Sequence, residues 1–133
     1  MPQVDKQSSY NFIDLFAGAG GLSEGFLLAG FRPVAHVEMN EYAAKTLETR
    51  SAYYYLRSTG NLDLYKNYLS GKISRDEFMK QIPTSVTKTV INETLSNETL
   101  PAVFNTIDGI IKIRGIEKVD VIIGGPPCQA YSL

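Results

Sequence analysis

The 133-residue sequence has few of the features that mark secreted, membrane or metal-binding proteins. Its single cysteine excludes an internal disulfide and any zinc site built from several cysteines. No apolar run approaches the roughly 20 residues that a membrane-spanning helix needs. Residues 1–9 are polar and carry both signs of charge, unlike the apolar segment of a signal peptide. These absences predict a cytoplasmic protein with no membrane partner and no metal site.

A basic excess is also missing, because 13 Lys and Arg residues face 14 Asp and Glu residues. Freestanding nucleic-acid binders are usually basic, since neutralising phosphates supplies most of their affinity. If the chain acts on nucleic acid, most of the gripping surface therefore belongs elsewhere. A hydrophobic content of 44% still predicts a folded domain with a core.

Apolar segments separated by glycine turns predict a doubly wound, parallel α/β sheet. Residues 11–16 have the pattern of a buried strand before a glycine turn, and residues 33–38 that of a second strand. The helix between them should end at Gly30, and Asn40 is a good N-cap for the next helix. Residues 118–124 predict a further strand close to the end of the sequence, so the sheet should be incomplete.

Residues 51–99 depart from this alternation. A stretch this short buries little core alone, so we expect a helical insertion on the sheet and not a separate domain. Ser74 and Glu77 have the spacing of a capping box, and the helix that they begin should end before Pro83. Residues 100–111 then show the clearest amphipathic helical pattern in the sequence.

The glycine loop at residues 16–21 predicts a cofactor site. Its glycines permit positive φ and let a ligand approach the backbone. Glu38 ends the next strand, where a carboxylate can accept two ribose hydroxyls. Ser23 occupies the third glycine position of the dinucleotide fingerprint, and Asp14 suits the ammonium group of a sulfonium amino acid. The loop thus favours a methyl donor, although an ordinary tight turn with a solvated glutamate fits the same residues.

The only cysteine follows two prolines at the end of a predicted strand. Pro126 and Pro127 fix φ and remove two N–H donors, which stiffens the approach to Cys128. A thiolate there could add to C6 of cytosine and so make C5 nucleophilic enough to take a methyl group. The sole histidine, His36, has the place of a core or rim residue, which disfavours a Cys–His hydrolase.

These two motifs together resemble the cytosine-C5 DNA methyltransferase family. The segment 14–21 is similar to its S-adenosyl-L-methionine motif, Glu38 to its ribose-binding acid, and 124–129 with Ser132 to its PCQxxS catalytic loop. The resemblance implies that Cys128 attacks a cytosine flipped out of double-stranded DNA. It further implies S-adenosyl-L-homocysteine as the product and a bacterial restriction–modification enzyme.

The resemblance also implies the site residues. The implied catalytic residue is Cys128, and the implied substrate-loop residues are Pro127, Gln129 and Ser132. The cofactor-binding residues are Asp14, Phe16, Ala17, Gly18, Gly20, Gly21, Leu22, Glu38, Met39 and Pro126. Family members carry an acidic residue after the third strand for the adenine amino group, and here both Asn92 and Glu93 remain candidates.

Other family features have no counterpart in residues 1–133. The glutamate and arginine motifs, the target-recognition domain and the last helix of the cofactor pocket are missing. We therefore expect the N-terminal part of a catalytic domain, inactive alone, whose partner is the remainder of the enzyme as a C-terminal part or a second subunit. A tRNA cytosine-C5 methyltransferase and a non-catalytic S-adenosylmethionine-binding relative stay open as alternatives.

Overall fold

Parallel strands flanked by helices make up residues 10–127, which are the residues that this computed structural model describes. Four strands pair in the order β3-β2-β1-β4, and every pairing is parallel. The strands are β1 (Asn11–Asp14), β2 (Arg32–Glu38), β3 (Val90–Asn92) and β4 (Val121–Ile123). The predicted α/β fold with an incomplete parallel sheet is confirmed.

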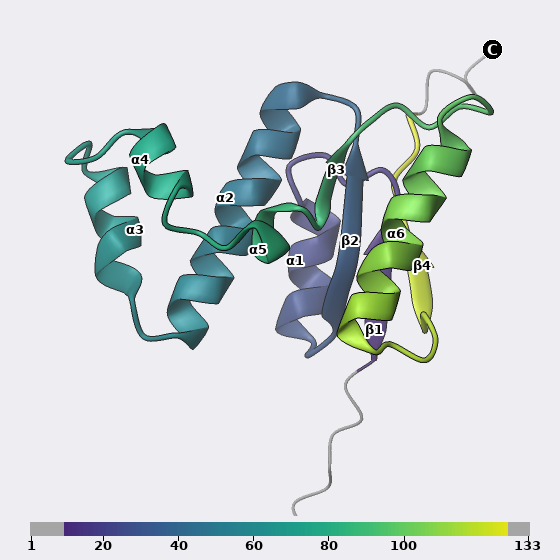
Figure 1. Cartoon of the computed structure of the whole chain (residues 1–133), viewed down its shortest axis with the longest axis horizontal. Helices are drawn as coiled ribbons and strands as arrows, with labels where there is room; N and C mark the ends of the chain where they lie inside the picture. The colour runs from purple at the N-terminus through teal and green to yellow at the C-terminus, as the bar shows by residue number, and fades with distance from the viewer. Residues whose placement is uncertain (1–9, 128–133) are drawn as a thin grey trace, which may run out of the picture.

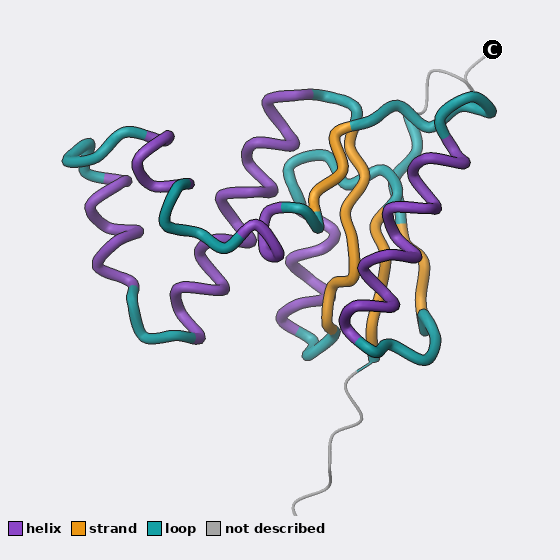
Figure 2. The backbone as a smooth tube through the Cα atoms, in the orientation of Figure 1, coloured by secondary structure: helices purple, strands orange, loops and turns teal. Residues whose placement is uncertain are grey.

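Helices cover both faces of the sheet (Figure 1). α1 and α2 lie against one face, and α6 lies against the other. α3 and α4 extend away from the sheet, beyond α2 (Figure 2). The helices are α1 (Gly21–Leu28), α2 (Glu41–Ser58), α3 (Leu62–Leu69), α4 (Arg75–Met79), α5 (Thr84–Thr87) and α6 (Leu100–Arg114). Within residues 10–127, no helix is long and apolar enough to cross a membrane.

The core on the α6 face is aliphatic, and the core on the α1 face is aromatic. Ile13 of β1 packs with Val103 and Ile107 of α6, and all three are buried. On the opposite face the ring of Phe12 lies against Phe26 of α1, with centroids 5.3 Å apart. Burial on both faces explains why residues 12–14 of β1 and 34–37 of β2 are buried without the alternation of a one-sided sheet.

The strand register brings the carboxyl ends of the strands to one edge of the sheet. Asp14 pairs with His36 of β2 and with Ile123 of β4, and Glu38 pairs with Asn92 of β3. The loops that leave these strand ends meet at the edge where doubly wound sheets bind ligands. β1 is shorter than the predicted 11–16 because the chain turns into the glycine loop after Asp14, and β4 is shorter than the predicted 118–124 mainly because it begins only at Val121.

Residues 59–89, which we call the helical arm, share a second core with α2. Phe78 and Ile82 of the arm pack against Ala52 and Leu56 of α2, and all four are buried. This second core explains why α2 continues unbroken to its end at Ser58. The predicted insertion at 51–99 thus begins inside α2, and β3 near its end belongs to the sheet.

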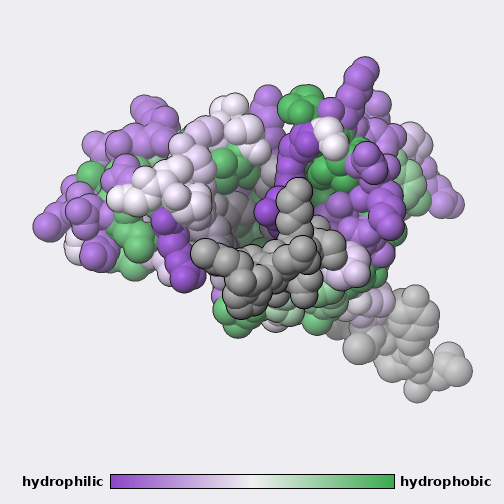
Figure 3. Space-filling view, turned by 90° about the horizontal axis from the view of Figure 1, so that it is seen from below, coloured by the Kyte–Doolittle hydropathy of each residue, from purple (hydrophilic) through white to green (hydrophobic). Residues whose placement is uncertain are grey.

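Local signals in the arm are confirmed. The Ser74 hydroxyl accepts the Glu77 N–H, and the Glu77 carboxylate accepts the Ser74 N–H at 2.7 Å, which completes the capping box. α4 ends at Met79, ahead of Pro83. On the face of the molecule seen in Figure 3, the outer parts are mainly hydrophilic and hydrophobic residues form small patches.

Candidate cofactor site

The glycine loop leaves β1 at the carboxyl edge and leads into α1. Gly18 and Gly20 have φ values of +55° and +93°, and Gly20 is the N-cap of α1. A Cβ atom on Gly20 would lie 3.0 Å from Leu47 Cδ2 and 3.1 Å from Arg50 Nε. Both the backbone conformation and the lack of space require glycine at position 20.

Glu38 connects the glycine loop to the turn after β2. Its Oε2 atom accepts the Gly18 N–H at 2.6 Å, and its Oε1 atom accepts the Asn40 N–H at 2.9 Å. Each carboxylate oxygen can accept more than one hydrogen bond. The carboxylate therefore orders the loop and retains capacity for further donors.

The loops at the carboxyl edge enclose a cavity of about 360 Å³. Glu38 borders it, and so do residues that follow each of the four strands. The lining comprises Leu15, Phe16 and Gly18, then Val37, Glu38 and Met39, then Glu93, Thr94 and Leu95, and finally Gly125 and Pro127. The cavity thus joins segments that are distant in the sequence.

The segment after β4 lies against the segment after β1. The Leu15 N–H donates to the Ile123 carbonyl at 3.0 Å. A Cβ atom on Gly124 would lie 3.1 Å from Phe16 Cδ2, so glycine there lets the two segments touch. This places the proline pair beside the glycine loop, as the sequence predicts. Cys128, Gln129 and Ser132 lie outside the described residues.

Asp14 is a fully buried carboxylate at the end of β1. Among the described residues, neither of its oxygens has a hydrogen-bond partner. Burial raises the pKa of Asp14 to about 6, and the negative charge of Glu38 adds to this effect. The Phe16 N–H opposes the shift without forming a bond of good geometry. A buried acid without a partner is costly, so a cationic ligand group would relieve it.

The remaining predicted cofactor residues differ in their relation to the cavity. Phe16 and Met39 line it and are partly exposed. Ala17 is buried and donates its N–H to the Val37 carbonyl. Leu22 lies in the first turn of α1, and its side chain is half-exposed. Gly20, Gly21 and Pro126 also lie beside the lining residues without belonging to them. Their roles stay predictions.

Asn92 and Glu93 occupy different positions relative to the cavity. The Asn92 amide donates to the carbonyls of Glu38 and Met39, at 2.9 and 3.1 Å, and so braces the turn after β2. Glu93 lines the cavity instead. Of the two predicted candidates for the adenine contact, only Glu93 therefore lines the cavity.

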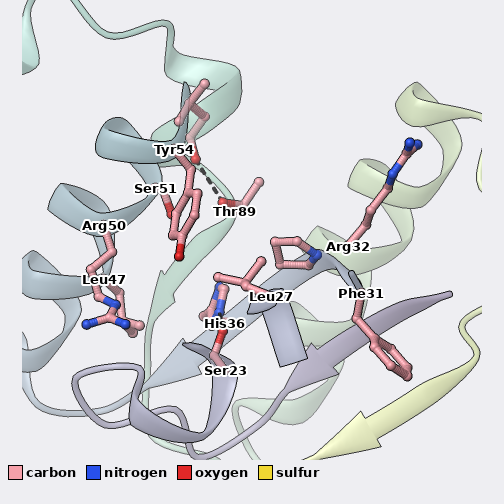
Figure 4. Close-up of a pocket in the computed structure, with 12 residues that line it drawn as sticks. Ser23, Leu27, Phe31, Arg32, His36, Leu47, Arg50, Ser51, Tyr54 and Thr89 are labelled. Atoms are coloured by element: carbon pink, nitrogen blue, oxygen red, sulfur yellow. Dashed lines mark hydrogen bonds between the residues drawn. The ribbon is translucent and has the colours of Figure 1, made fainter. Parts of the chain in front are cut away.

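A second cavity, of about 300 Å³, is lined by residues of α1, β2 and α2 (Figure 4). His36 and Ser23 line it, and their Nε2 and Oγ atoms are 2.6 Å apart. Burial, with the nearby Arg50 charge, lowers the pKa of His36 to about 4. His36 is therefore neutral near pH 7, and of the core and rim positions that the sequence leaves open it occupies a buried one.

Sequence reasoning missed the residues behind the glycine loop. Arg50 and Leu47 of α2 fill the space where a Cβ atom on Gly20 would lie. Thr94 and Leu95 line the cavity of about 360 Å³ at the carboxyl edge. Nothing in the local pattern distinguishes these residues from ordinary helix and loop positions. The described residues contain no cluster of His, Cys, Asp and Glu side chains that could hold a metal ion.

Comparison with known proteins identifies the family. The family model for C-5 cytosine-specific DNA methylases matches residues 10–78. The chain is 37% identical to the type II methyltransferase M.Bpa9945I of Bacillus paralicheniformis, over 91% of this chain and 31% of that protein. It is 35% identical to the putative type II methyltransferase M.MjaORF1200P of Methanocaldococcus jannaschii, over 91% of this chain and 36% of that one.

The chain spans about a third of the length of these relatives. No solved structure is significantly similar to it. The family match covers the glycine loop, Glu38 and the whole of α2, whereas the cavity-lining residues that follow β3 and β4 lie beyond it. The chain belongs to the C-5 cytosine-specific DNA methylase family.

Proposed function

We propose that this chain is the N-terminal part of the catalytic domain of a DNA (cytosine-5-)-methyltransferase from a bacterial, cytoplasmic restriction–modification system. The enzyme would move the methyl group of S-adenosyl-L-methionine to C5 of a cytosine flipped out of duplex DNA. The main support is the cavity shared by the glycine loop, Glu38 and Pro127. The relatives named as type II methyltransferases support the same reaction.

The residues around the cavity fit S-adenosyl-L-methionine. Glu38 has lone pairs left for the ribose hydroxyls, and the partly exposed Phe16 ring offers a packing surface. Glu93 lines the cavity and would contact the adenine amino group. Asp14 is buried and does not line the cavity, but its unpartnered carboxylate at the end of β1 would suit the ammonium group. When bound, the cofactor supplies an electrophilic methyl group, and the glycine loop and Glu38 orient it.

Cys128 would supply the nucleophile. Its thiolate forms a bond to C6 of cytosine, and the electrons of the C5–C6 double bond make C5 nucleophilic toward the methyl group. Loss of the C5 proton and cleavage of the S–C6 bond then restore the thiolate and the aromatic ring. A free thiol titrates near a pKa of about 8.5, so the assembled site must favour the anion. The rigid proline pair limits the positions that the thiol can take.

The remaining machinery would come from the rest of the enzyme. The formal net charge of −1 argues against a large DNA-gripping surface on this chain. The C-terminal part or a second subunit would supply that surface, target recognition and the groups that move protons at the ring. Residues 1–133 should therefore not methylate DNA alone.

Covalent capture tests the proposal. Full-length enzyme mixed with S-adenosyl-L-methionine and duplex DNA that contains 5-fluorocytosine should form a stable protein–DNA adduct. The Cys128→Ser variant should form none, and an adduct with that variant would overturn the proposed nucleophile. No adduct with the unaltered enzyme would favour the non-catalytic alternative.

Substrate competition separates DNA from RNA. Transfer of labelled methyl groups to duplex DNA should greatly exceed transfer to tRNA when both are present at equal concentration. The opposite preference would establish the tRNA alternative, which shares both sequence motifs.

A further inference from the structure

We call the cavity of about 360 Å³ at the carboxyl edge of the sheet the cofactor cavity. Side chains of α2 lie beside the glycine loop without lining this cavity. Gly20 has no room for a Cβ atom, because Arg50 Nε, Arg50 Cδ and Leu47 Cδ2 would lie 3.0–3.3 Å from it. Arg50 borders the second cavity and does not line the cofactor cavity. The Arg50 side chain therefore occupies the space beside Gly20, the N-cap of α1.

A hydrogen-bonded group holds the Arg50 guanidinium in this position. Arg50 Nη2 donates to Glu24 Oε2 at 2.5 Å, and the Tyr54 hydroxyl donates to Glu24 Oε1 at 2.6 Å. Glu24 lies in the first turn of α1, one turn beyond Gly20. Arg50 and Tyr54 are one turn apart on α2, and both are labelled in Figure 4. The group thus joins the first turn of α1 to the middle of α2.

The helix that carries Arg50 and Tyr54 is itself anchored. Ala52 and Leu56, on the same stretch of α2, are buried in the core that α2 shares with the helical arm. The rings of Tyr53 and Tyr65 lie 5.1 Å apart and add a further contact between α2 and α3. The arm therefore fixes the segment of α2 from which the support of the loop comes.

The glycine loop needs such support. Gly20 makes no side-chain cap for α1, and glycines at positive φ lose much conformational entropy when they are ordered. A loop that populates its binding conformation only part of the time binds its ligand more weakly by that fraction. Half-exposed ion pairs contribute little to global stability. Loss of this one should therefore change ligand binding more than folding.

We propose that Arg50, oriented by Glu24 and Tyr54, is a positioning residue that holds the glycine loop in the conformation that binds the cofactor. This inference rests on the proposed function, because it assigns the loop to S-adenosyl-L-methionine.

The matched control for Arg50 is Arg75 of α4. Arg75 donates to Glu48 Oε2 at 2.8 Å and to Thr49 Oγ1 at 2.7 Å, and its hydrogen bonds all go to α2. The side chains of both ion pairs are about equally exposed, at 36% and 33% for Arg50–Glu24 and 28% and 34% for Arg75–Glu48. The two pairs differ in that only Arg50 contacts the glycine loop.

The test uses the full-length enzyme and compares Arg50→Met with Arg75→Met. Arg50→Met should raise the Kd for S-adenosyl-L-homocysteine and the KM for S-adenosyl-L-methionine by about 10-fold. Arg75→Met should change either constant less than about twofold. The kcat at saturating cofactor and the KM for DNA should stay the same in both variants. Equal effects of the two substitutions on cofactor binding would overturn the proposal.

Two further measurements separate positioning from general loosening of the fold. Arg50→Lys should recover part of the lost affinity. Glu24→Gln should add little to the effect of Arg50→Met, because both substitutions break the same Arg50–Glu24 ion pair. Amide hydrogen exchange in Arg50→Met should accelerate at residues 18–24 and not in the arm. Additive effects, or faster exchange throughout the chain, would contradict the inference. If the unaltered enzyme binds neither cofactor nor product, the proposed function itself fails.

Discussion

The Glu38 carboxylate accepts the Gly18 backbone N–H at 2.6 Å and so ties the end of β2 to a loop 20 residues earlier in the chain. The acid predicted to bind ribose therefore also shapes the glycine loop. Glu38 substitutions should for this reason affect both the loop and the ligand.

Glu38→Ala should weaken binding of S-adenosyl-L-homocysteine by about 1–3 kcal/mol, the usual cost of leaving bound polar groups unpaired. Glu38→Gln keeps one oxygen acceptor and should lose less. Isothermal titration calorimetry on the full-length enzyme measures both. Unchanged affinity in Glu38→Ala would show that Glu38 is only a surface acid.

Asp14→Asn should stabilise the ligand-free protein above about pH 6 and weaken cofactor binding. The pKa of Asp14 rises from 3.8 to about 6 on folding. The protonated form is thus favoured by the fold, and this contribution to stability is present below pH 3.8 and is lost as the pH rises through about 6. At higher pH the buried charge costs on the order of 3 kcal/mol, which asparagine avoids.

Urea denaturation of the two proteins over the range from about pH 4 to 8 checks this expectation. The gain in stability from Asp14→Asn should shrink as the pH falls. A gain that does not depend on pH would assign the effect to packing and not to the charge.

His36→Gln should make the protein less sensitive to mild acid. The pKa of His36 falls from 6.5 to about 4 on folding, because the ring is buried. The neutral ring contributes stability that is present above pH 6.5 and is lost as the pH falls through about 4. This linkage predicts that the unaltered protein loses about 2 kcal/mol between about pH 7.5 and 5 through His36.

Asp14 acts in the opposite direction over the same pH range, so His36 must be isolated by comparing single variants. Ser23→Ala removes the hydroxyl beside Nε2 and keeps the ring, and should retain the acid sensitivity. Equal acid sensitivity in His36→Gln and the unaltered protein would show that His36 does not control it.

Gly20→Ala should destabilise the protein by about 1–3 kcal/mol and reduce cofactor binding. The positive φ of Gly20 is unfavourable for alanine, and the new Cβ atom would meet Leu47 and Arg50. Gly25→Ala is the control within the same helix, because its Cβ atom would meet open space. That substitution should stabilise the protein by roughly 0.5–1 kcal/mol. Thermal unfolding distinguishes the two, and a neutral Gly20→Ala would contradict the geometry.

Features that depend on near neighbours in the chain were predictable. The Ser74–Glu77 capping box, the positive φ of Gly30 after α1 and the strand that ends at Glu38 all follow from short-range patterns. The meeting of the glycine loop and the proline pair was also predictable. Parallel strands bring their carboxyl ends to one edge, and both motifs follow such strands.

The length of α2 and the position of β3 were harder to predict. The second half of α2 is held by Phe78 and Ile82, which lie more than 20 residues later, and no local pattern reports that contact. β3 has only three residues, too few for a periodic signal, and is a strand because it pairs with β2.

The amino-acid sequence alone determined the parallel α/β order, the two motifs and the family expectation, because each depends on residues close together in the chain. Only the tertiary structure decided that Asn92 braces a turn while Glu93 lines the cavity, and that Arg50 packs behind Gly20. These relationships join segments 30 or more residues apart, and side-chain packing and hydrogen bonding across such distances depend on how the elements dock.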